Sequence, residues 1–324
     1  MDTAYPHPVY TASSEQSWWH SMQIYNYGSI NIDHIYRVPH LVQPGETLAS
    51  HDYQQVLGGK GANQSIALAK AGASVRHIGR YHANDDALLE NMRSAGVDTS
   101  LLQTTDTPSG HAIIQVDDNA ENSIVLYAGA NHSFKASELA GLLESAQPSD
   151  WLLLQNECSC TAEMIDAAVA AGLKVAFNPA PMTEAIAQLP LEKLNVLFIN
   201  QIEALQLLQA DIINPPSAEE MATQLQQMLP NTEVVITLGA KGACHVYQGK
   251  TQYAKAWKVE AVDTTGAGDT FIGYYLQAIA EGKTVTEALK QGCAASALCV
   301  QQMGASSSIP TASAVNQFLA GVNA

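Results

Sequence analysis

The sequence predicts an open α/β fold in which a mostly parallel β-sheet carries helices on both of its faces. Short apolar runs alternate along the chain with helical segments that stop at glycine. That alternation is typical of a parallel sheet with crossover helices. The 324 residues, 47% of them hydrophobic, are enough to bury the core of such a fold in a single domain.

The expected strands and helices follow one another in the order of repeated strand–helix units. Strands are predicted at residues 23–30, 75–78, 151–154, 174–177, 196–199 and 234–238. Helices are predicted at residues 63–71, 85–95 and 163–171. Each helix ends next to a glycine (Gly72, Gly96 or Gly172), which is a helix-stop signal.

Two segments interrupt this alternation. Residues 34–57 and 111–129 contain strand-like runs without a helix between them, and Asp118-Asn119 favours a hairpin turn. We interpret both segments as a small β flap, or lid, over one end of the sheet. Ordinary edge strands are the alternative.

Charge and composition exclude several classes of protein. A net charge of -16 argues against a nucleic-acid or anionic-membrane surface. No apolar run approaches the ~20 residues of a membrane span. The five cysteines lack zinc-site spacing and are typical of reduced thiols in a cytoplasmic protein. Residues 1–21 contain no Lys or Arg, so we expect a disordered or non-native leader, with a single domain at 22–324.

The segment Asp-Thr-Thr-Gly-Ala-Gly-Asp-Thr at residues 263–270 carries the strongest functional signal. Small residues let backbone amides converge on one point, and a helix starting there adds free N–H groups and a positive dipole end. Asp269 beside bound phosphate makes sense where a hydroxyl is deprotonated next to a transferring phosphoryl group. The alternative is an ordinary loop with an acid in the first helical turn.

Two upstream segments are rich in glycine. Residues 28–33 (Gly-Ser-Ile-Asn-Ile-Asp) end the first strand, where ligands bind in open α/β sheets. Asn31 and Asp33 suit sugar hydroxyls, although they are also turn formers. Residues 58–63 (Gly-Gly-Lys-Gly-Ala-Asn) open the first long helix without P-loop spacing. Asn63 can bind hydroxyls, and Lys60 is either solvated or close to a transferred phosphate.

Together these three segments resemble the signatures of the PfkB sugar-kinase family, and the chain is most similar to its ribokinase branch. The stretches that carry the resemblance stand in family order at residues 28–34, 44–47, 58–64, 128–131, 178–181, 237–239 and 263–270. The resemblance implies a ribokinase-like α/β fold with a lid and a cytoplasmic, ATP-dependent sugar kinase. In three places the chain departs from the family pattern: residues 80–86 lack a glycine, Cys293 stands where a His is frequent, and Gln201-Ile202 replaces a more polar pair.

The resemblance also implies a role for each motif residue. Asp269 would be the base for the primary hydroxyl of the sugar, and the amides of Gly266, Ala267 and Gly268 would form an anion hole for the γ-phosphate. The implied sugar-binding residues are Asn31, Asp33, Gly59, Lys60, Gly61, Asn63, Glu157 and Asp269. The implied nucleotide-binding residues are Asn200, Thr237, Leu238, Gly239, Ala240, Lys241, Gly242, Gly268 and Cys293.

Two metal ions are implied as well. The Asn200-x-x-Glu203 pattern resembles the family's magnesium motif, in which Glu203 would hold Mg²⁺ through water. A capping Asn with an acid in the first helical turn is the alternative. A monovalent cation, usually K⁺, would be held mostly by carbonyl groups of Asp263, Thr265, Cys299, Gln302, Gly304 and Ser308.

The most specific expectation is phosphorylation of D-ribose by ATP to ribose 5-phosphate. Other acceptors of the family stay open: fructose, 2-keto-3-deoxygluconate or a ribonucleoside. A non-catalytic sugar or nucleotide sensor on the same fold is the alternative from another class. Exposed edges of the lid favour a homodimer, and neither nucleic acid nor membrane is an expected partner.

Overall fold

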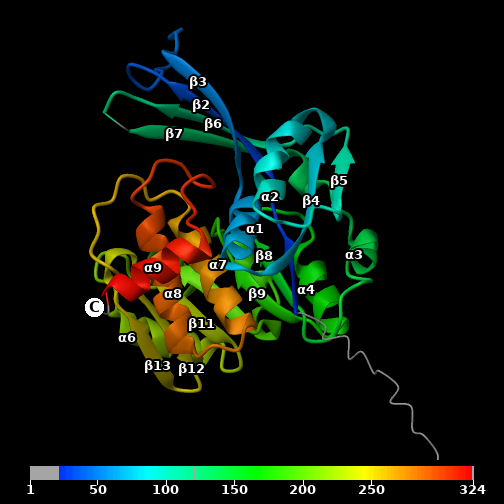
Figure 1. Cartoon of the computed structure of the whole chain (residues 1–324), viewed down its shortest axis with the longest axis vertical. Helices are drawn as coiled ribbons and strands as arrows, with labels where there is room; N and C mark the ends of the chain where they lie inside the picture. Colours follow the sequence, from blue (N-terminus) through cyan, green and yellow to red (C-terminus); the bar gives the residue numbers. More distant parts are fainter. Residues whose placement is uncertain (1–21, 120, 323–324) are drawn as a thin grey trace, which may run out of the picture.

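The computed structural model describes residues 22–119 and 121–322, so the predicted leader lies outside the described residues. Within them, one sheet has nine strands (Figure 1). Its spatial order is β13 (Lys250–Ala254), β12 (Ala243–Tyr247), β11 (Glu233–Thr237), β10 (Val196–Asn200), β9 (Lys174–Asn178), β8 (Trp151–Gln155), β1 (Gln23–Tyr27), β4 (Ser74–His82) and β5 (Leu102–Thr105). The strands from β5 to β11 are parallel, and β12 and β13 add an antiparallel edge. The mostly parallel sheet is thereby confirmed.

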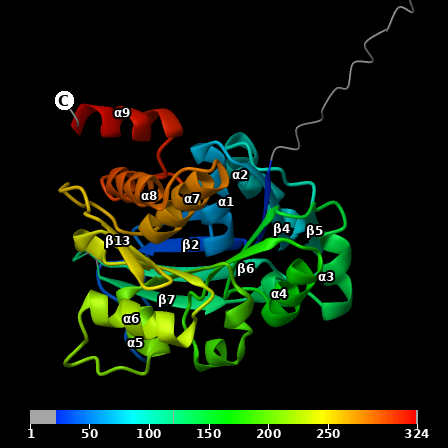
Figure 2. The same cartoon turned by 90° about the horizontal axis from the view of Figure 1, so that it is seen from below.

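Helices cover both faces of this sheet, as predicted (Figure 2). One face carries α1 (Lys60–Ala71), α2 (Glu90–Ser94), α7 (Ala267–Ala280), α8 (Val285–Cys299) and α9 (Ala312–Val322). The other carries α3 (Ala136–Leu142), α4 (Thr161–Ala170), α5 (Gln201–Leu207) and α6 (Ala218–Met228). Successive side chains of a strand point to opposite faces, so Ile24 of β1 packs into one core cluster and Tyr25 into the other. In the described part of the chain, none of the helices combines the length and apolar character of a membrane span.

Local signals explain most helix boundaries, with one correction. Helix α1 ends at Gly72, which adopts the left-handed conformation with φ 106°. The single helix predicted at residues 85–95 is instead a 3₁₀ segment, Ala83–Leu89, followed by the short α2. Asp85 accepts a hydrogen bond from the Ser109 hydroxyl (2.6 Å), and Asp86 accepts one from Arg93 (2.6 Å). These side-chain bonds hold the first turns in the tighter form.

The predicted lid is a second sheet of four strands. Its order is β3 (Asp52–Gly58), β2 (Asn31–Arg37), β6 (Gly110–Val116) and β7 (Asn122–Tyr127), and it projects from the body at the top of Figure 1. Strands β2 and β6 are parallel, and both outer pairs are antiparallel. Asp117 accepts hydrogen bonds from the amides of Asn119 and Glu121 at the turn between β6 and β7. Because β2 starts at residue 31, Asn31 and Asp33 belong to the lid itself.

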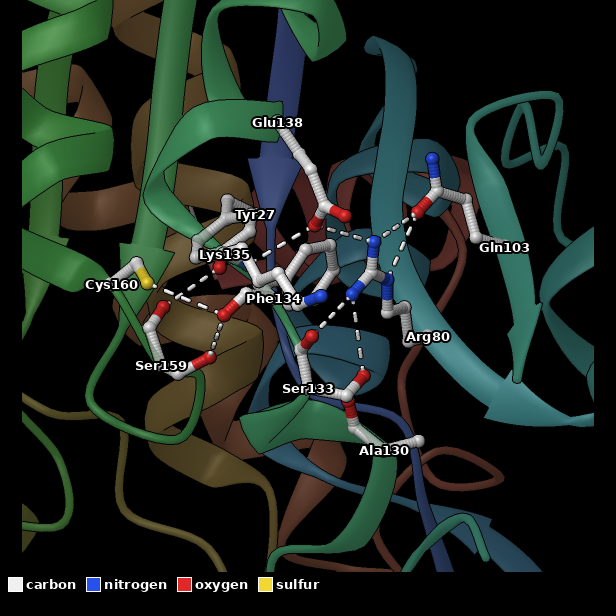
Figure 3. Close-up of polar contacts among 10 residues, drawn as sticks. All are labelled: Tyr27, Arg80, Gln103, Ala130, Ser133, Phe134, Lys135, Glu138, Ser159 and Cys160. Atoms are coloured by element: carbon white, nitrogen blue, oxygen red, sulfur yellow. Dashed lines mark hydrogen bonds and ion pairs between the residues drawn. The ribbon is translucent and has the colours of Figure 1, made fainter. Parts of the chain in front are cut away.

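Arg80 of β4 ties the edge of the main sheet to the segment that returns from the lid (Figure 3). Its guanidinium donates to Gln103 of β5 (2.8 and 2.9 Å), to Glu138 of α3 (2.9 Å) and to the carbonyl of Ser133. It also lies 4.3 Å from the ring centroid of Phe134, a favourable cation–π arrangement. Arg80 is also the first residue of the stretch 80–86, in which the chain departs from the family pattern.

The same returning segment holds the base of the lid. The side chain of Asn131 accepts a hydrogen bond from the amide of Ile30 (3.0 Å) and donates one to Oδ1 of Asn31 (2.8 Å). Asn131 is almost fully buried. Asn131 therefore ties Ile30 and the first residue of β2, Asn31, to the segment that follows β7.

Candidate active site

A cavity of about 240 Å³ lies where the carboxyl ends of β9, β10 and β11 meet the N-terminus of α7. It is lined by Lys60, Asn178, Ala180, Phe198, Ile199, Asn200, Glu203, Thr237, Thr264, Gly266, Gly268, Asp269 and Ile272. Two of the sequence motifs, at residues 58–63 and 263–270, thus meet at the edge of the sheet where ligands of open α/β folds bind.

Asp269 lies in the first turn of α7 and is only 8% exposed. Its Oδ1 accepts a hydrogen bond from Nε2 of Gln64 (2.9 Å), and its Oδ2 accepts one from Nδ2 of Asn63 (3.1 Å). Both donors are side chains of α1. The acid of one motif is therefore in direct contact with the glycine-rich motif some 200 residues earlier.

The residues before Asp269 present a helix N-terminus to the cavity. Gly266 caps α7 in the left-handed conformation with φ 75°, which glycine adopts without steric cost. The amide of Ala267 donates to the carbonyl of Thr264 at 3.3 Å, whereas no hydrogen bond among the described residues uses the amide of Gly268. Gly266 and Gly268 both line the cavity. The positive end of the helix dipole makes this position suitable for an anion.

Lys60 adds a positive charge to the same cavity. It is the first residue of α1 and lines the cavity. The negative charges of Asp269, Glu157 and Glu203 raise the pKa of Lys60, whereas its burial acts to lower it. A cation held among three acids offsets part of their mutual repulsion. It would also be an electrostatic partner for phosphate oxygens.

Glu157 follows β8 and connects the two upstream motifs. Its Oε2 accepts hydrogen bonds from the hydroxyl of Ser29 and from the amide of Lys60 (3.0 Å). Ser29 in turn accepts a bond from the amide of Gly61 (3.1 Å). Burial raises the pKa of Glu157. Because both bonds use the same carboxylate oxygen, Glu157 holds these loops together while its Oε1 has no hydrogen bond to the described residues.

Three polar side chains of the two upstream motifs carry groups with no partner in the described residues. The carboxylate of Asp33 lies against Gly58 without a hydrogen bond, and burial together with the charge of Glu157 raises its pKa to about 6. Oδ1 of Asn63 is buried and has no partner. Asn31 uses its Oδ1 for Asn131, which leaves its amide nitrogen. Since buried polar groups normally find partners, this set fits a ligand with several hydroxyls.

The predicted nucleotide-binding residues are only partly brought together. Thr237, at the end of β11, lines the cavity. Gly239–Lys241 form a 3₁₀ turn that leads into β12, and the amide of Leu238 donates to the carbonyl of Gly242 (2.7 Å). Ala240 within this turn is exposed. Cys293 is buried in a core cluster and is not among the residues that line the cavity.

Asn200 and Glu203 cap a helix and lie at the cavity. Oδ1 of Asn200 accepts from the amide of Glu203 (2.9 Å), and Oε2 of Glu203 accepts from the amide of Asn200 (2.9 Å). This capping box starts α5. Both residues also line the cavity, and burial raises the pKa of Glu203. Capping therefore orients Glu203 without removing it from the site.

The residues proposed for a monovalent cation gather beside the start of α7. Asp263 accepts from the amide of Gly304 (2.9 Å) and from the hydroxyl of Thr265 (2.7 Å). Sγ of Cys299 lies 3.1 Å from the hydroxyl of Ser308. The amide of Gln302 donates to the carbonyl of Cys299 (3.2 Å). In residues 22–119 and 121–322, no three His, Cys, Asp or Glu side chains come together as a metal-binding group.

Two amide side chains at the site, Gln64 and Asn178, were not among the predicted site residues. Gln64 follows Asn63 in the glycine-rich motif, and Asn178 opens the Asn-Pro-Ala-Pro stretch at the carboxyl end of β9. Gln64 lies inside a helix and Asn178 ends a buried strand, and neither position carries a local mark of function. Their contact, 3.1 Å from Nε2 of Gln64 to Oδ1 of Asn178, depends on packing between distant segments.

A family model described as pfkB family carbohydrate kinase matches residues 22–312, and the chain belongs to this family. Among curated relatives, the ribokinase of Haemophilus influenzae is 39% identical over 301 residues, covering 90% of this chain and 96% of the relative. The ribokinase of Staphylococcus aureus is 33% identical over 297 residues, covering 90% of this chain and 97% of that protein.

Solved structures give the same result. The ribokinase of Cryptococcus neoformans, crystallised with ADP, is similar with a TM-score of 0.81 at 34% identity and covers 92% of this chain and 99% of its own. The ribokinase of Arabidopsis thaliana, complexed with ribose and ATP, is similar with a TM-score of 0.83 at 28% identity and with the same coverage of both chains. The predicted resemblance to the ribokinase branch and the predicted fold are confirmed.

Proposed function

We propose that this carbohydrate kinase transfers the γ-phosphoryl group of ATP to the primary hydroxyl of D-ribose and forms ribose 5-phosphate. One observation carries the proposal: Asp269 lines the same cavity as Gly266, Gly268 and Thr237, and it contacts Asn63, whose buried Oδ1 has no partner among the described residues. The similarity to ribokinases, one of them a complex with ribose and ATP, supports ribose as the acceptor.

In this reaction Asp269 takes the proton of the primary hydroxyl while the oxygen attacks the γ-phosphorus in line. The bond to the β-phosphate oxygen breaks, and ADP leaves. The amides at the start of α7 and the ammonium of Lys60 stabilise the negative charge on the transferred group. Asp33, Asn63 and Glu157 hold the other hydroxyls, together with Asn31 and the backbone of Gly59 and Gly61. The catalytic contribution is positioning and electrostatics.

The residues present fit the two implied cations. Glu203 offers one carboxylate beside the cavity, which suits Mg²⁺ that keeps most of its waters and reaches the protein through them. The ion would neutralise phosphate charge there. The oxygen-rich cluster at residues 263–265 and 304–308 would hold K⁺ and so stabilise the loop before α7.

The test is a panel of acceptors in an ADP-release assay, run with potassium and with sodium. D-Ribose is expected to give the highest kcat/KM, and potassium a higher rate than sodium. Fructose, 2-keto-3-deoxygluconate and ribonucleosides differ from ribose in the hydroxyls that would bind the buried polar groups. Sites with buried polar groups discriminate strongly between substrates that differ in this way. Preference for one of these would replace ribose as the acceptor. Binding of ribose without any turnover would favour the sensor.

The lid also supports the proposed homodimer. Its strands bear exposed apolar side chains, and Val125 on β7 is 64% exposed. Val125 pairs with Ile113, which pairs with His34, so these three residues face away from Asp33 on the opposite side of the lid. A sheet with an uncovered apolar face gains by pairing with a second copy.

Replacing Val125 by Glu is expected to convert the dimer to a monomer, because it places a charge in the apolar contact. Sedimentation velocity measures the mass of both proteins. Val169→Glu is the matched control, since Val169 is an exposed residue of α4 on the body. A parent protein that sediments as a monomer at every concentration would contradict the dimer.

A pH dependence follows from Asp33. Burial and Glu157 raise its pKa from the ordinary 3.8 to about 6, so its carboxyl loses its charge as the pH falls through about 6. Hydrogen bonds to charged acceptors contribute about 1.5–3 kcal/mol. The KM for ribose is therefore expected to rise below pH 6. Asp33→Asn should raise this KM about 10- to 100-fold at pH 8 and remove its pH dependence.

The same shift has a consequence for stability. The folded protein holds the proton of Asp33 more tightly than the unfolded chain does. The contribution of this protonation to the free energy of unfolding is therefore complete below about pH 4, and it is lost as the pH rises through about 6. Asp33→Asn is expected to be more stable than the parent by up to about 3 kcal/mol above pH 7, and equally stable below pH 4. Urea unfolding across pH measures this difference. Asp52→Asn, at the far end of β3, is the control.

A further inference from the structure

Gln64 is a fully buried residue of α1 that touches the proposed base. Its Nε2 donates to Oδ1 of Asp269 (2.9 Å) and to Oδ1 of Asn178 (3.1 Å). Its Oε1 accepts from Nε2 of Gln155 (2.6 Å). Gln64 has 0% exposure and does not line the cavity. It therefore acts on the site through other side chains.

The orientation of the Gln64 amide is fixed from one end by the backbone of α1. Nδ2 of Asn26 donates to the carbonyl of Gly61 (2.8 Å), so Oδ1 of Asn26 must accept, and it does so from Nε2 of Gln155 (3.0 Å). The same nitrogen of Gln155 faces Oε1 of Gln64. Because a carbonyl can only accept, this chain of amides directs the NH₂ group of Gln64 toward Asp269.

A second backbone carbonyl fixes the same orientation from the other end. Nδ2 of Asn178 donates to the carbonyl of Phe198 in β10 (3.0 Å), which turns Oδ1 of Asn178 toward Gln64. Both ends therefore require a donor at the nitrogen of Gln64. A flipped amide would lose all three of its hydrogen bonds, and the side chains involved are buried. Such losses are costly in a buried network.

We propose that Gln64 is the positioning residue of Asp269, an inference that rests on the proposed kinase function. Its amide holds Oδ1 and so sets the rotation of the carboxylate. Oδ2, on the side of Asn63, is then the oxygen that receives the proton of the sugar hydroxyl. The amide chain from Asn26 through Gln155 makes this orientation independent of bound ligand. It also couples Asp269 to Asn178 on the wall of the cavity.

The test replaces Gln64 by Met, which keeps the volume but removes the donors. Since misplacement of a reacting group by about 1 Å costs on the order of 100-fold in rate, kcat is expected to fall about 10- to 100-fold. The KM for ribose should change less than about 3-fold, because the sugar is held by other residues. Gln277→Met is the matched control: Gln277 is a buried glutamine of α7 whose amide contacts Glu281 (2.9 Å). It should leave kcat within about 2-fold of the parent value.

Gln64→Glu is the second variant and keeps the shape of the side chain. It retains an acceptor for Gln155 but presents an oxygen to Asp269, so kcat is expected to fall at least as far as in Gln64→Met. Thermal unfolding shows whether each variant is folded. A folded Gln64→Glu protein with the parental kcat would overturn the inference.

A double mutant separates positioning from a general structural effect. If Gln64 acts through Asp269, adding Gln64→Met to Asp269→Asn should lower kcat no further than Asp269→Asn alone. A multiplicative loss would contradict the proposal. A parent protein without turnover of any acceptor would instead refute the kinase function, so the two failures are distinguishable.

Discussion

Asp269→Asn is expected to lower kcat about 1,000-fold, because general-base catalysis contributes roughly 100- to 10,000-fold and an amide cannot accept the proton of the hydroxyl. Asp269 is the acid in contact with both Asn63 and Gln64 at the start of α7. A coupled ADP-release assay with saturating ribose and ATP measures the loss. No other substitution proposed for this chain should reduce the chemical step as much.

The variant should remain folded, for a reason visible in the hydrogen bonds around Asp269. Oδ1 of the new Asn can still accept from Gln64. Its Nδ2 would meet the Nδ2 of Asn63, but Asn63 can rotate its amide and offer Oδ1, which has no partner in the parent. After that rotation Asn63 presents its NH₂ group to the sugar instead of its carbonyl oxygen. The KM for ribose should therefore rise, but only a few-fold.

The control is Asp166→Asn, which removes an exposed acid that pairs with Lys193 (2.7 Å) on the surface. Exposed pairs contribute about 0–1 kcal/mol, and the rate should not change. If Asp269→Asn retained the parental kcat while folded, Asp269 would not be the base, and the assignment of the site would have to be abandoned.

Gly273→Leu is expected to lower the free energy of unfolding on the order of 3 kcal/mol, at the upper end for overpacked cores. Gly273 lies one turn after Asp269 on α7 and faces α1. A Cβ there would lie 2.4 Å from Cβ of Ala67 and 2.8 Å from the backbone nitrogen of Leu68. Backbone cannot yield as a flexible side chain does, so the two helices would have to separate.

Separation of α1 and α7 should also reduce kcat, because the bonds from Asn63 and Gln64 to Asp269 span these helices. Leucine favours helix over glycine by about 1 kcal/mol, so a loss of stability must come from packing. Gly141→Leu on α3 is the matched control, since nothing lies within 4 Å of a Cβ at that position. Urea unfolding and kcat are measured for both. If both variants unfolded at the same urea concentration, the close contact between Gly273 and α1 would not determine the stability, and the prediction would be wrong.

Much of the fold could be predicted because its signals are local. The apolar runs at residues 151–154 and 196–199 are the buried strands β8 and β10. Gly72 ends α1 in the left-handed conformation that was expected of a stop signal. The helix predicted at residues 85–95 was wrong in type over its first half, because bonds from Ser109 and Arg93 decide the conformation of Asp85 and Asp86.

For the candidate site, the sequence indicated which residues carry chemistry but not all the groups that orient them. Asp269, Asn63 and Lys60 stand in motifs whose residue types match phosphoryl transfer. Glu203 was open between a capping and a metal-binding role, and its geometry serves capping while it lines the cavity. Gln64 was unmarked, because an amide inside a helix acquires its role only from Gln155 and Asn178.

The sequence by itself determined the alternation of strands and helices, the chemical groups at the carboxyl ends of the strands and the membership in a kinase family. These follow from periodicity, turn residues and short motifs, each of which acts over a few neighbouring residues. Only the tertiary structure decided that α1 packs on α7, that β2 pairs with β6 to make the lid, and that one buried amide faces the carboxylate of Asp269. Such contacts join residues far apart in the chain, and their energy depends on the packing and burial of the whole fold.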